Sequence, residues 1–367
     1  MTGFLLLLAG CAGQVAPNAA QPSVVQAVAP AEPAAVGVSS IQPAGLMRIV
    51  DEATAPDVNL VMPAAPAAAP PGAVAPGYAM TPTFAAPATN AFAAAAVRSP
   101  FQSDHEFDGF VGPMTDPIQA KDARSLTEAR LLVLSNWSKP GTPVLGSGTY
   151  QVYALQLRLA LTERLQIFAD KDGIVRVSPR PGNSVTGLAN IAAGAQYAFI
   201  RDVENQFLFT GAVQYEAPTG YANIYQNQGS GLLGVYGIFA KEFGDSWHLS
   251  GQFGQNIAVQ NQQAGYFYTH LHVDKRFGSF VPFFEANWFY YNQSAKFLPA
   301  SVNMEGAGFI NLGTAGFTGN NIVTLAPGFK YDFGQNIEFG CCYQFPVSDP
   351  LKSLYGNQVI AELIVRY

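Results

Sequence analysis

Charged residues and long apolar runs are both scarce in this chain. Charged side chains make up 12% of its 367 residues, against about 25% in an average soluble domain. Beyond the N-terminus no run reaches about 18 apolar residues, which excludes a membrane-spanning helix there. The chain is nevertheless 49% hydrophobic, with 26 Phe, 16 Tyr and 36 Gly. This composition favours short apolar strands and tight turns over helices.

Several kinds of chemical site are also missing. The three cysteines cannot form a disulfide framework, and the net charge of −6 argues against a nucleic-acid partner. Gly229-Ser-Gly231 and Gly306-Ala-Gly308 lack the helix and the lysine of a phosphate-binding loop, and the sequence has no Gly-x-Ser-x-Gly motif. We therefore expect no enzyme and no cofactor. The alternative is a lipase- or protease-like barrel that uses His248, His270 or His272 beside a loop serine.

The first residues form an apolar run that ends in small residues, which is typical of an export signal. We assign this signal to residues 1–13. The first basic residue is only Arg48, so we expect that the true start of the protein lies upstream. The sequence Leu8-Ala-Gly-Cys11 resembles a lipobox, which predicts lipidation of Cys11. The alternative is an ordinary signal in which Cys11 is discarded with the cleaved peptide.

Alanine and proline dominate residues 14–98. Proline interrupts helices and strands, and alanine offers little area to bury, so we predict a disordered periplasmic linker. The alternative is a tail that tethers the protein to the cell wall or binds a partner. Residues 99–124 form a polar segment before the barrel. They include Asp104, His105 and Asp108, which we interpret as a solvated surface rather than a metal site.

From residue 125 onward, apolar and polar side chains alternate in segments of about ten to fourteen residues, as in membrane strands. For example, Tyr153, Leu155 and Leu157 share one face of a segment, and Gln156 and Arg158 lie on the other. The segments that we predict as strands are residues 127–137, 149–161, 163–171, 187–200, 205–217, 230–242, 246–258, 264–275, 279–292, 320–333, 336–346 and 357–367.

The connections between these segments are short and long in alternation, as in barrels with short periplasmic turns and longer outer loops. We therefore predict an all-β fold, in which residues 125–367 form a transmembrane antiparallel up-and-down β-barrel of about twelve strands. It would lie in the outer membrane of a diderm bacterium, with lipid as one partner and the leader in the periplasm. The C-terminal strand ends on an aromatic residue, Tyr367, which predicts a signal read by the barrel-assembly machinery.

Polar residues with inward parity are candidates for lining the lumen. They either form a plug of ion pairs or line a narrow aqueous passage, because unpaired charges in a confined space are unfavourable. His270, His272 and Asp274 share one face and could hold a metal, but we expect hydrogen bonds to neighbouring strands instead. Parity also directs Cys341 to lipid and Cys342 to the interior. The lumen-lining candidates are Arg158, Arg164, Glu242, His270, His272, Asp274, Glu285, Asn287, Lys330 and Glu338.

The stretches Asp122–Arg130, Tyr153–Leu165 and Ala169–Gly173 resemble the bacterial outer-membrane family named for the MetA pathway of phenol degradation. This resemblance implies a transporter-like barrel for hydrophobic or aromatic compounds, and it assigns no functional residue. The function that we predict is a passive channel or transporter for small solutes. The alternative is a structural or adhesive barrel whose lumen stays closed.

Overall fold

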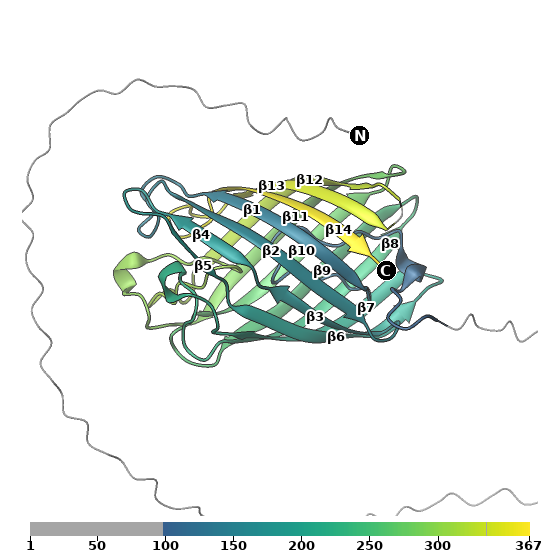
Figure 1. The fold of residues 1–367 in the computed structure, drawn as a ribbon, viewed down its shortest axis with the longest axis horizontal. Coiled ribbons are helices and arrows are strands. Elements are labelled where there is room, and N and C mark those ends of the chain that lie inside the picture. Colours follow the sequence, from purple (N-terminus) through teal and green to yellow (C-terminus); the bar gives the residue numbers. More distant parts are fainter. Residues whose placement is uncertain (1–97, 335) are drawn as a thin grey trace, which may run out of the picture. The chain divides into compact units, whose positions relative to one another are not determined.

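The computed structural model describes residues 98–367 with the exception of Gln335. These residues form one antiparallel sheet that closes on itself (Figure 1). The export signal, Cys11 and nearly all of the linker at 14–98 lie outside the described residues. No helix in the described part of the chain is long and apolar enough to cross a membrane.

The described residues contain three short 3₁₀ helices and fourteen strands. The helices are η1 (His105–Phe107), η2 (Ala222–Ile224) and η3 (Ala300–Val302). The strands are β1 (Glu128–Trp137), β2 (Thr149–Ala160), β3 (Leu165–Lys171), β4 (Ile174–Ser178), β5 (Val185–Leu188), β6 (Ile191–Asp202), β7 (Phe207–Ala217), β8 (Leu232–Phe243), β9 (Trp247–Ala258), β10 (Gly265–Lys275), β11 (Phe280–Gln293), β12 (Asn321–Asp332), β13 (Ile337–Pro346) and β14 (Asn357–Arg366).

The fourteen strands form a twelve-stranded barrel, because two of the twelve barrel strands are each interrupted. Strands β3 and β4 pair successively with different parts of β2, so together they form one interrupted barrel strand. Strands β5 and β6 form the next one in the same way, since β5 pairs with β4 and β6 pairs with β3. Strand β1 pairs with both β2 and β14, which closes the ring. The predicted barrel of about twelve strands is therefore confirmed.

The interruption at β3 and β4 is where the sequence prediction was wrong. We expected a loop from Asp172 to Gly187, whereas β4 and β5 occupy much of it. The cause is Gly173, which has a φ of +95° and bends the chain without ending its pairing with β2. A Cβ at this position would lie 2.2 Å from the carbonyl oxygen of Tyr153. The glycine thus allows a close approach of two strands, and it does not mark a turn.

Alternation along each strand separates an apolar outer face from a polar inner face. In β2, Leu155 and Leu157 are exposed, while Gln156 and Arg158 are buried. The same pattern places Cys341 partly exposed and Cys342 buried on β13, as predicted. Large hydrophobic side chains are exposed on nearly every strand. Such a continuous apolar surface suits acyl chains, because a water-soluble protein rarely exposes apolar patches of this extent.

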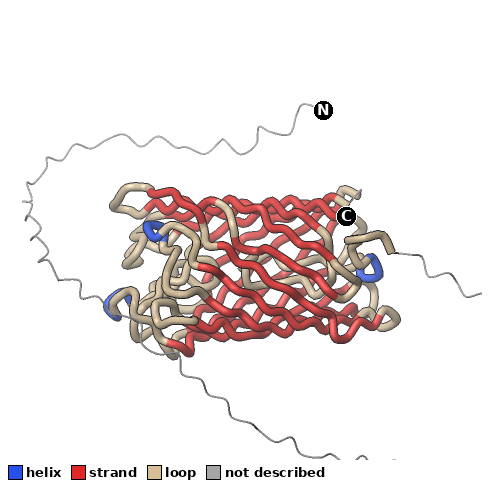
Figure 2. Tube along the Cα trace, turned by 60° about the horizontal axis from the view of Figure 1, so that its bottom comes forward, coloured by secondary structure: helices blue, strands red, loops and turns tan. Residues whose placement is uncertain are grey.

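The two ends of the barrel differ in the length of their connections (Figure 2). One end, which we call the turn end, has the short connections 161–164, 203–206, 244–246, 276–279 and 333–336. The other, the loop end, has the connections 138–148, 179–184, 218–231, 259–264, 294–320 and 347–356. The C-terminus lies at the turn end, where Ser103 donates a backbone hydrogen bond to Tyr367 (2.9 Å). Long and short connections therefore alternate as predicted.

Candidate functional site: the plugged lumen

Residues 99–126, which we call the plug, pass from the turn end into the lumen. Every residue from Phe110 to Leu126 is buried, and Figure 2 shows loop segments lying within the ring of strands. This differs from the expected solvated segment before the barrel. His105 and Asp108 are exposed, but Asp104 and Asp122 are buried. The carboxylate of Asp104 pairs with Arg201, which is distant in sequence, and the carboxylate of Asp122 pairs with Arg124 within the plug.

The plug is anchored where it enters the barrel. The guanidinium of Arg201 on β6 donates two hydrogen bonds to the carboxylate of Asp104, at 2.9 and 2.7 Å. The backbone N–H of Asp104 donates to the carbonyl oxygen of Ser125 at the far end of the plug (2.9 Å). The plug is thus a hairpin-like excursion whose two ends meet at the turn end. A bidentate arginine–carboxylate pair fixes the relative orientation of the two side chains as well as the distance between them.

Glu285 on β11 binds the middle of the plug. Its carboxylate accepts hydrogen bonds from the backbone N–H groups of Met114 (2.8 Å) and Thr115 (2.7 Å), and also from the Thr115 hydroxyl. Asn287, two residues further along the same face, donates to the same hydroxyl oxygen at 2.9 Å. We call Glu285 and Asn287 the latch. A carboxylate bound by three donors at one point fixes the middle of the plug at the wall.

Glutamine side chains of the wall bind the backbone of the plug. Gln156 on β2 donates to the carbonyl of Pro117 (2.9 Å). Gln252 on β9 both donates to the carbonyl of Gln119 (2.7 Å) and accepts from the N–H of Lys121 (2.9 Å). Similarly, Gln196 on β6 donates to the carbonyls of residues 122 and 124, each at 2.9 Å. The plug has no neighbouring strand, so these glutamine side chains supply the hydrogen-bond partners that its backbone N–H and C=O groups need.

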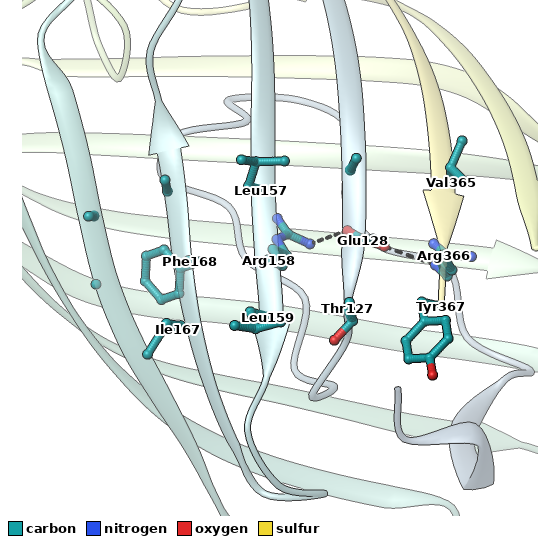
Figure 3. Close-up of a pocket in the computed structure, with 14 residues that line it drawn as sticks. Thr127, Glu128, Leu157, Arg158, Leu159, Ile167, Phe168, Val365, Arg366 and Tyr367 are labelled. Atoms are coloured by element: carbon teal, nitrogen blue, oxygen red, sulfur yellow. Dashed lines mark hydrogen bonds and ion pairs between the residues drawn. The ribbon is translucent and has the colours of Figure 1, made fainter. Parts of the chain in front are cut away.

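Several charged residues in and around the plug form ion pairs. Lys121 of the plug lies 2.7 Å from Asp170 on β3, and Arg124 pairs with Asp122 within the plug at 2.6 Å. In the wall, Glu128 bridges Arg158 and Arg366, each at 2.9 Å (Figure 3). Opposite charges in a water-poor lumen stabilise each other only in such close geometry. Of the two arrangements expected from the sequence, the described structure has the ion-paired plug.

A second group of paired charges lies on β12, β13 and β14. Lys330 is within 2.9 Å of Glu338 and 2.6 Å of Glu362, and Arg130 on β1 also contacts Glu362. Neither oxygen of Glu362 receives a well-aligned hydrogen bond, so these contacts are ion pairs by proximity. We call Arg130, Lys330 and Glu362 the buried triad.

Histidines and carboxylates form a continuous chain from the turn end to the latch. His248 Nδ1 lies 2.7 Å from Asp274 Oδ1, and His272 lies between Asp274 Oδ2 (3.0 Å) and Glu285 Oε1 (2.7 Å). The rings of His248 and His272 are therefore hydrogen-bonded to carboxylates, as we expected for His272 and Asp274, whereas His270 Nε2 lies 3.5 Å from Glu285 without a hydrogen bond. Within the described residues, no group of three or more His, Cys, Asp or Glu side chains is arranged to hold a metal ion.

Most of the predicted lumen residues do lie inside the barrel, but Arg164 does not. Glu242 is half-buried at the turn end of β8, where its carboxylate lies beside Gly109 of the plug. Arg164 lies in the turn after β2, where its guanidinium donates to the carbonyls of Ala198 (2.9 Å) and Phe199 (3.3 Å), so it does not join Arg158 in a constriction. The candidates buried in the interior are Arg158, His270, His272, Asp274, Glu285, Asn287, Lys330 and Glu338. Sequence reasoning missed the plug itself and the glutamines that bind it, although the inward parity of those glutamines was visible.

The loop end is closed by part of the connection between β11 and β12. Residues 304–314, which we call the cap, are all buried. The carboxylate of Glu305 accepts hydrogen bonds from the backbone N–H groups of Leu312 (2.8 Å) and Thr314 (2.6 Å). Asn311 donates to the carbonyl of Ala264 beside β10 (2.7 Å). The cap is therefore folded around one buried acid and tied to the neighbouring loop.

The cap gives a topological prediction with an internal control. Ser301 is exposed in the same connection, whereas Asn311 is buried. If the loop end faces outward, a cysteine replacing Ser301 should react with an impermeant maleimide on intact cells. A cysteine replacing Asn311 should react far more slowly. Labelling of the Ser301→Cys variant only after the outer membrane is opened would reverse the orientation.

The cap should also weaken as pH rises. Burial raises the pKa of Glu305 from 4.5 to about 7, with the hydrogen bonds from Thr314 and Leu312 acting in the opposite direction. Because the folded cap holds the proton more tightly than an unfolded one, its contribution to stability is complete below pH 4.5 and is lost as pH rises through about 7. We expect faster amide exchange at Leu312 and Thr314 above that pH, after correction for intrinsic exchange. The Glu305→Gln variant should show a flat profile, and a flat profile in the wild type would contradict the prediction.

No protein-family model and no curated protein matches the sequence. Solved structures to which the chain is similar include an outer membrane channel from Pseudomonas putida F1, with 12% identity, a TM-score of 0.49, and coverage of 70% of this chain and 100% of that chain. The β domain of a Bordetella autotransporter, BrkA, has 11% identity, a TM-score of 0.40 and coverage of 66% and 100%. The KdgM porin, solved with disordered oligogalacturonate, has 9% identity, a TM-score of 0.36 and coverage of 65% and 98%. These likenesses are to outer-membrane barrels, and at such low values they carry no argument about function.

Proposed function

We propose that this protein is an outer-membrane channel for small solutes whose lumen is closed by its own N-terminal plug and opens when the plug moves. The observation that carries the proposal is the polar contact between plug and wall. The side chains of Gln156, Gln196, Gln252 and Glu285 bind the backbone of the plug. Water can replace such hydrogen bonds at little net loss. Displacing the plug would therefore leave a polar, hydrated passage.

The shape of the plug supports the same proposal. It is a segment without strands, held at the turn end by Asp104 and at the middle by Glu285, and it forms no part of the sheet. Its withdrawal would leave the strand pairing intact. A closed structural or adhesive barrel is the alternative, and the filled lumen favours it as long as the plug never moves. Membership in the family named for the MetA pathway is part of our proposal. The family implies hydrophobic or aromatic solutes, whereas the polar wall of the lumen favours polar ones.

Localisation and assembly complete the proposal. We place the barrel in the outer membrane of a diderm bacterium, with the loop end outside and the turn end and leader in the periplasm. The C-terminal Tyr367 has an exposed ring (59% exposed), which keeps it accessible to the assembly machinery. Lipidation of Cys11 remains part of this proposal for the leader.

A reversible crosslink tests the gating. The side chains of Thr115 and Asn287 are in contact (2.9 Å between Oγ1 and Nδ2), so cysteines at both positions should form a disulfide in a background without the native cysteines. In planar bilayers, the oxidised barrel should stay closed, and adding a reductant should restore channel openings. The matched control is the single Thr115→Cys variant, which should not respond to the reductant. Conductance that is the same before and after reduction would reject a mobile plug.

A further inference from the structure

One part of the lumen contains buried polar atoms that have no partner within the described residues. They lie in register on neighbouring strands, because Gln214 on β7 faces Gly234 on β8, Gly234 faces Asn256 on β9, and Asn256 faces Tyr266 on β10. The atoms without a partner are Gln214 Oε1, Asn256 Nδ2 and the Tyr266 hydroxyl. All three residues are at most 3% exposed.

The two loops at the loop end of these strands add amides of the same kind. Gln228 lies in the connection from β7 to β8, and Gln263 lies in the connection from β9 to β10. These connections are bound to each other, since the N–H of Gly229 donates to Gln262 (2.8 Å). Both amide atoms of Gln228 and the oxygen of Gln263 lack a partner, and both residues are 2% exposed. We call Gln214, Gln228, Asn256, Gln263 and Tyr266 the amide row.

Exchanging the oxygen and nitrogen of the amides does not satisfy the row. Tyr236 Oη lies 2.6 Å from Asn256 Oδ1 and 2.6 Å from Gln119 Oε1 of the plug. Its single proton can serve only one of them. If the Asn256 amide is turned, its oxygen loses its partner in place of its nitrogen. Each buried polar atom without a partner is unfavourable by about 1–3 kcal/mol, so a molecule that supplied the missing donors and acceptors would gain this free energy on binding.

The chemistry of the row defines what this ligand is. Its atoms include donors, acceptors and a hydroxyl that can be either, and the row itself carries no charge. The nearest carboxylate along β7, Glu216, is already paired with Lys171 and with Asn190 (2.7 Å). Within the row, the ring of Tyr266 packs near Tyr291, with centroids 5.4 Å apart, so aromatic carbon borders the amides. A neutral molecule with several hydroxyl groups matches this combination.

We propose that the amide row binds a small neutral polyhydroxylated solute, of the class of monosaccharides and cyclic polyols, at the loop end of the lumen. This inference rests on the proposed function, because it names the class of solute that the channel admits. The row lies between the connections of the loop end and the plug, to which Tyr236 links it through Gln119. A bound solute would therefore contact the plug side of the lumen before passage.

Binding is measured on the folded full-length barrel in detergent, by calorimetry with glucose and with myo-inositol. We expect binding to the wild type and at least about a tenfold loss of affinity in Gln214→Leu, Asn256→Leu and Tyr266→Phe variants. The matched control is Gln260→Leu, an exposed glutamine in the same connection as Gln263, which should bind normally. Glucuronate and glucosamine should bind more weakly than glucose, because the row has no charge to pair with theirs.

Thermal unfolding without sugar separates a ligand site from a structural role. The Gln214 oxygen has no partner to lose, so Gln214→Leu should keep or raise the unfolding temperature while it weakens binding. A lower unfolding temperature without sugar, or no binding of either probe to the wild type, would overturn the proposal and leave ordered water in the row. Since conductance plays no part in this measurement, a barrel that binds glucose but never opens would refute the proposed channel without refuting the site.

Discussion

Barrels carrying Glu285→Ala are expected to conduct far more often than the wild type. The substitution removes the acceptor of two backbone N–H groups and one hydroxyl of the plug. Hydrogen bonds to a charged group contribute about 1.5–3 kcal/mol each. Losing the two backbone bonds should therefore shift the balance between closed and open barrels by at least about a hundredfold.

Planar-bilayer recordings measure this shift as the fraction of time that the channel is open. Glu204→Ala is the matched control, because Glu204 is an exposed carboxylate at the turn end that forms no ion pair within the described residues, and its removal should leave the channel closed. Glu285→Gln keeps one acceptor and should give an intermediate result. A Glu285→Ala barrel that is folded and as closed as the wild type would show that the latch does not hold the plug.

Replacing Glu362 by Leu is expected to destabilise the barrel by about 3–5 kcal/mol. Glu362 is buried, and its carboxylate lies against Arg130 and 2.6 Å from Lys330. Without it, Arg130 loses its only ion-pair partner within the described residues, and Lys330 retains only Glu338. A buried charge that has lost its partner is far less favourable than the removal of both members of the ion pair. The midpoint of urea unfolding in lipid vesicles measures the effect.

A triple variant makes this prediction sharper. Changing Arg130 and Lys330 to Met together with Glu362→Leu removes the whole triad and leaves no uncompensated cation from it. It should recover much of the stability that Glu362→Leu loses, because apolar side chains of similar volume often replace buried ion pairs without loss. If the single and triple variants unfold at the same midpoint, the loss arises from packing around Glu362, and the electrostatic explanation is wrong.

The barrel could be predicted from the sequence because the pattern that specifies each strand lies within the residues of that strand. Alternation along one strand shows where it begins and ends, and the predicted strand 246–258 differs by one residue from β9 (Trp247–Ala258). The same parity placed Glu285 and Asn287 inside. Parity failed at Arg164, because the backbone of a turn no longer alternates and its side chain reached β6 instead. It also failed at Gly173, where a bend was taken for the end of a strand.

The plug could not be predicted because its partners are remote. Asp104 pairs with Arg201, and Thr115 with Glu285. Nothing in a polar segment of mixed charge distinguishes a solvated tail from one that satisfies its charges inside a barrel. The inward glutamines, Gln156, Gln196 and Gln252, were the available signal. Long amide side chains with both a donor and an acceptor are suited to bind a backbone, and three of them facing one lumen indicate a segment within it.

The position of the plug directly before β1 has a consequence for how the membrane is kept intact. The ring closes only when Glu128 to Trp137 pairs with β14, and the plug ends immediately before this strand at Leu126. The plug is therefore continuous with the strand that closes the ring, and the N–H of Ser103 near its start donates to the carbonyl of Tyr367. We expect insertion and sealing to be a single event, so that a newly made barrel never leaves the cell's permeability barrier open.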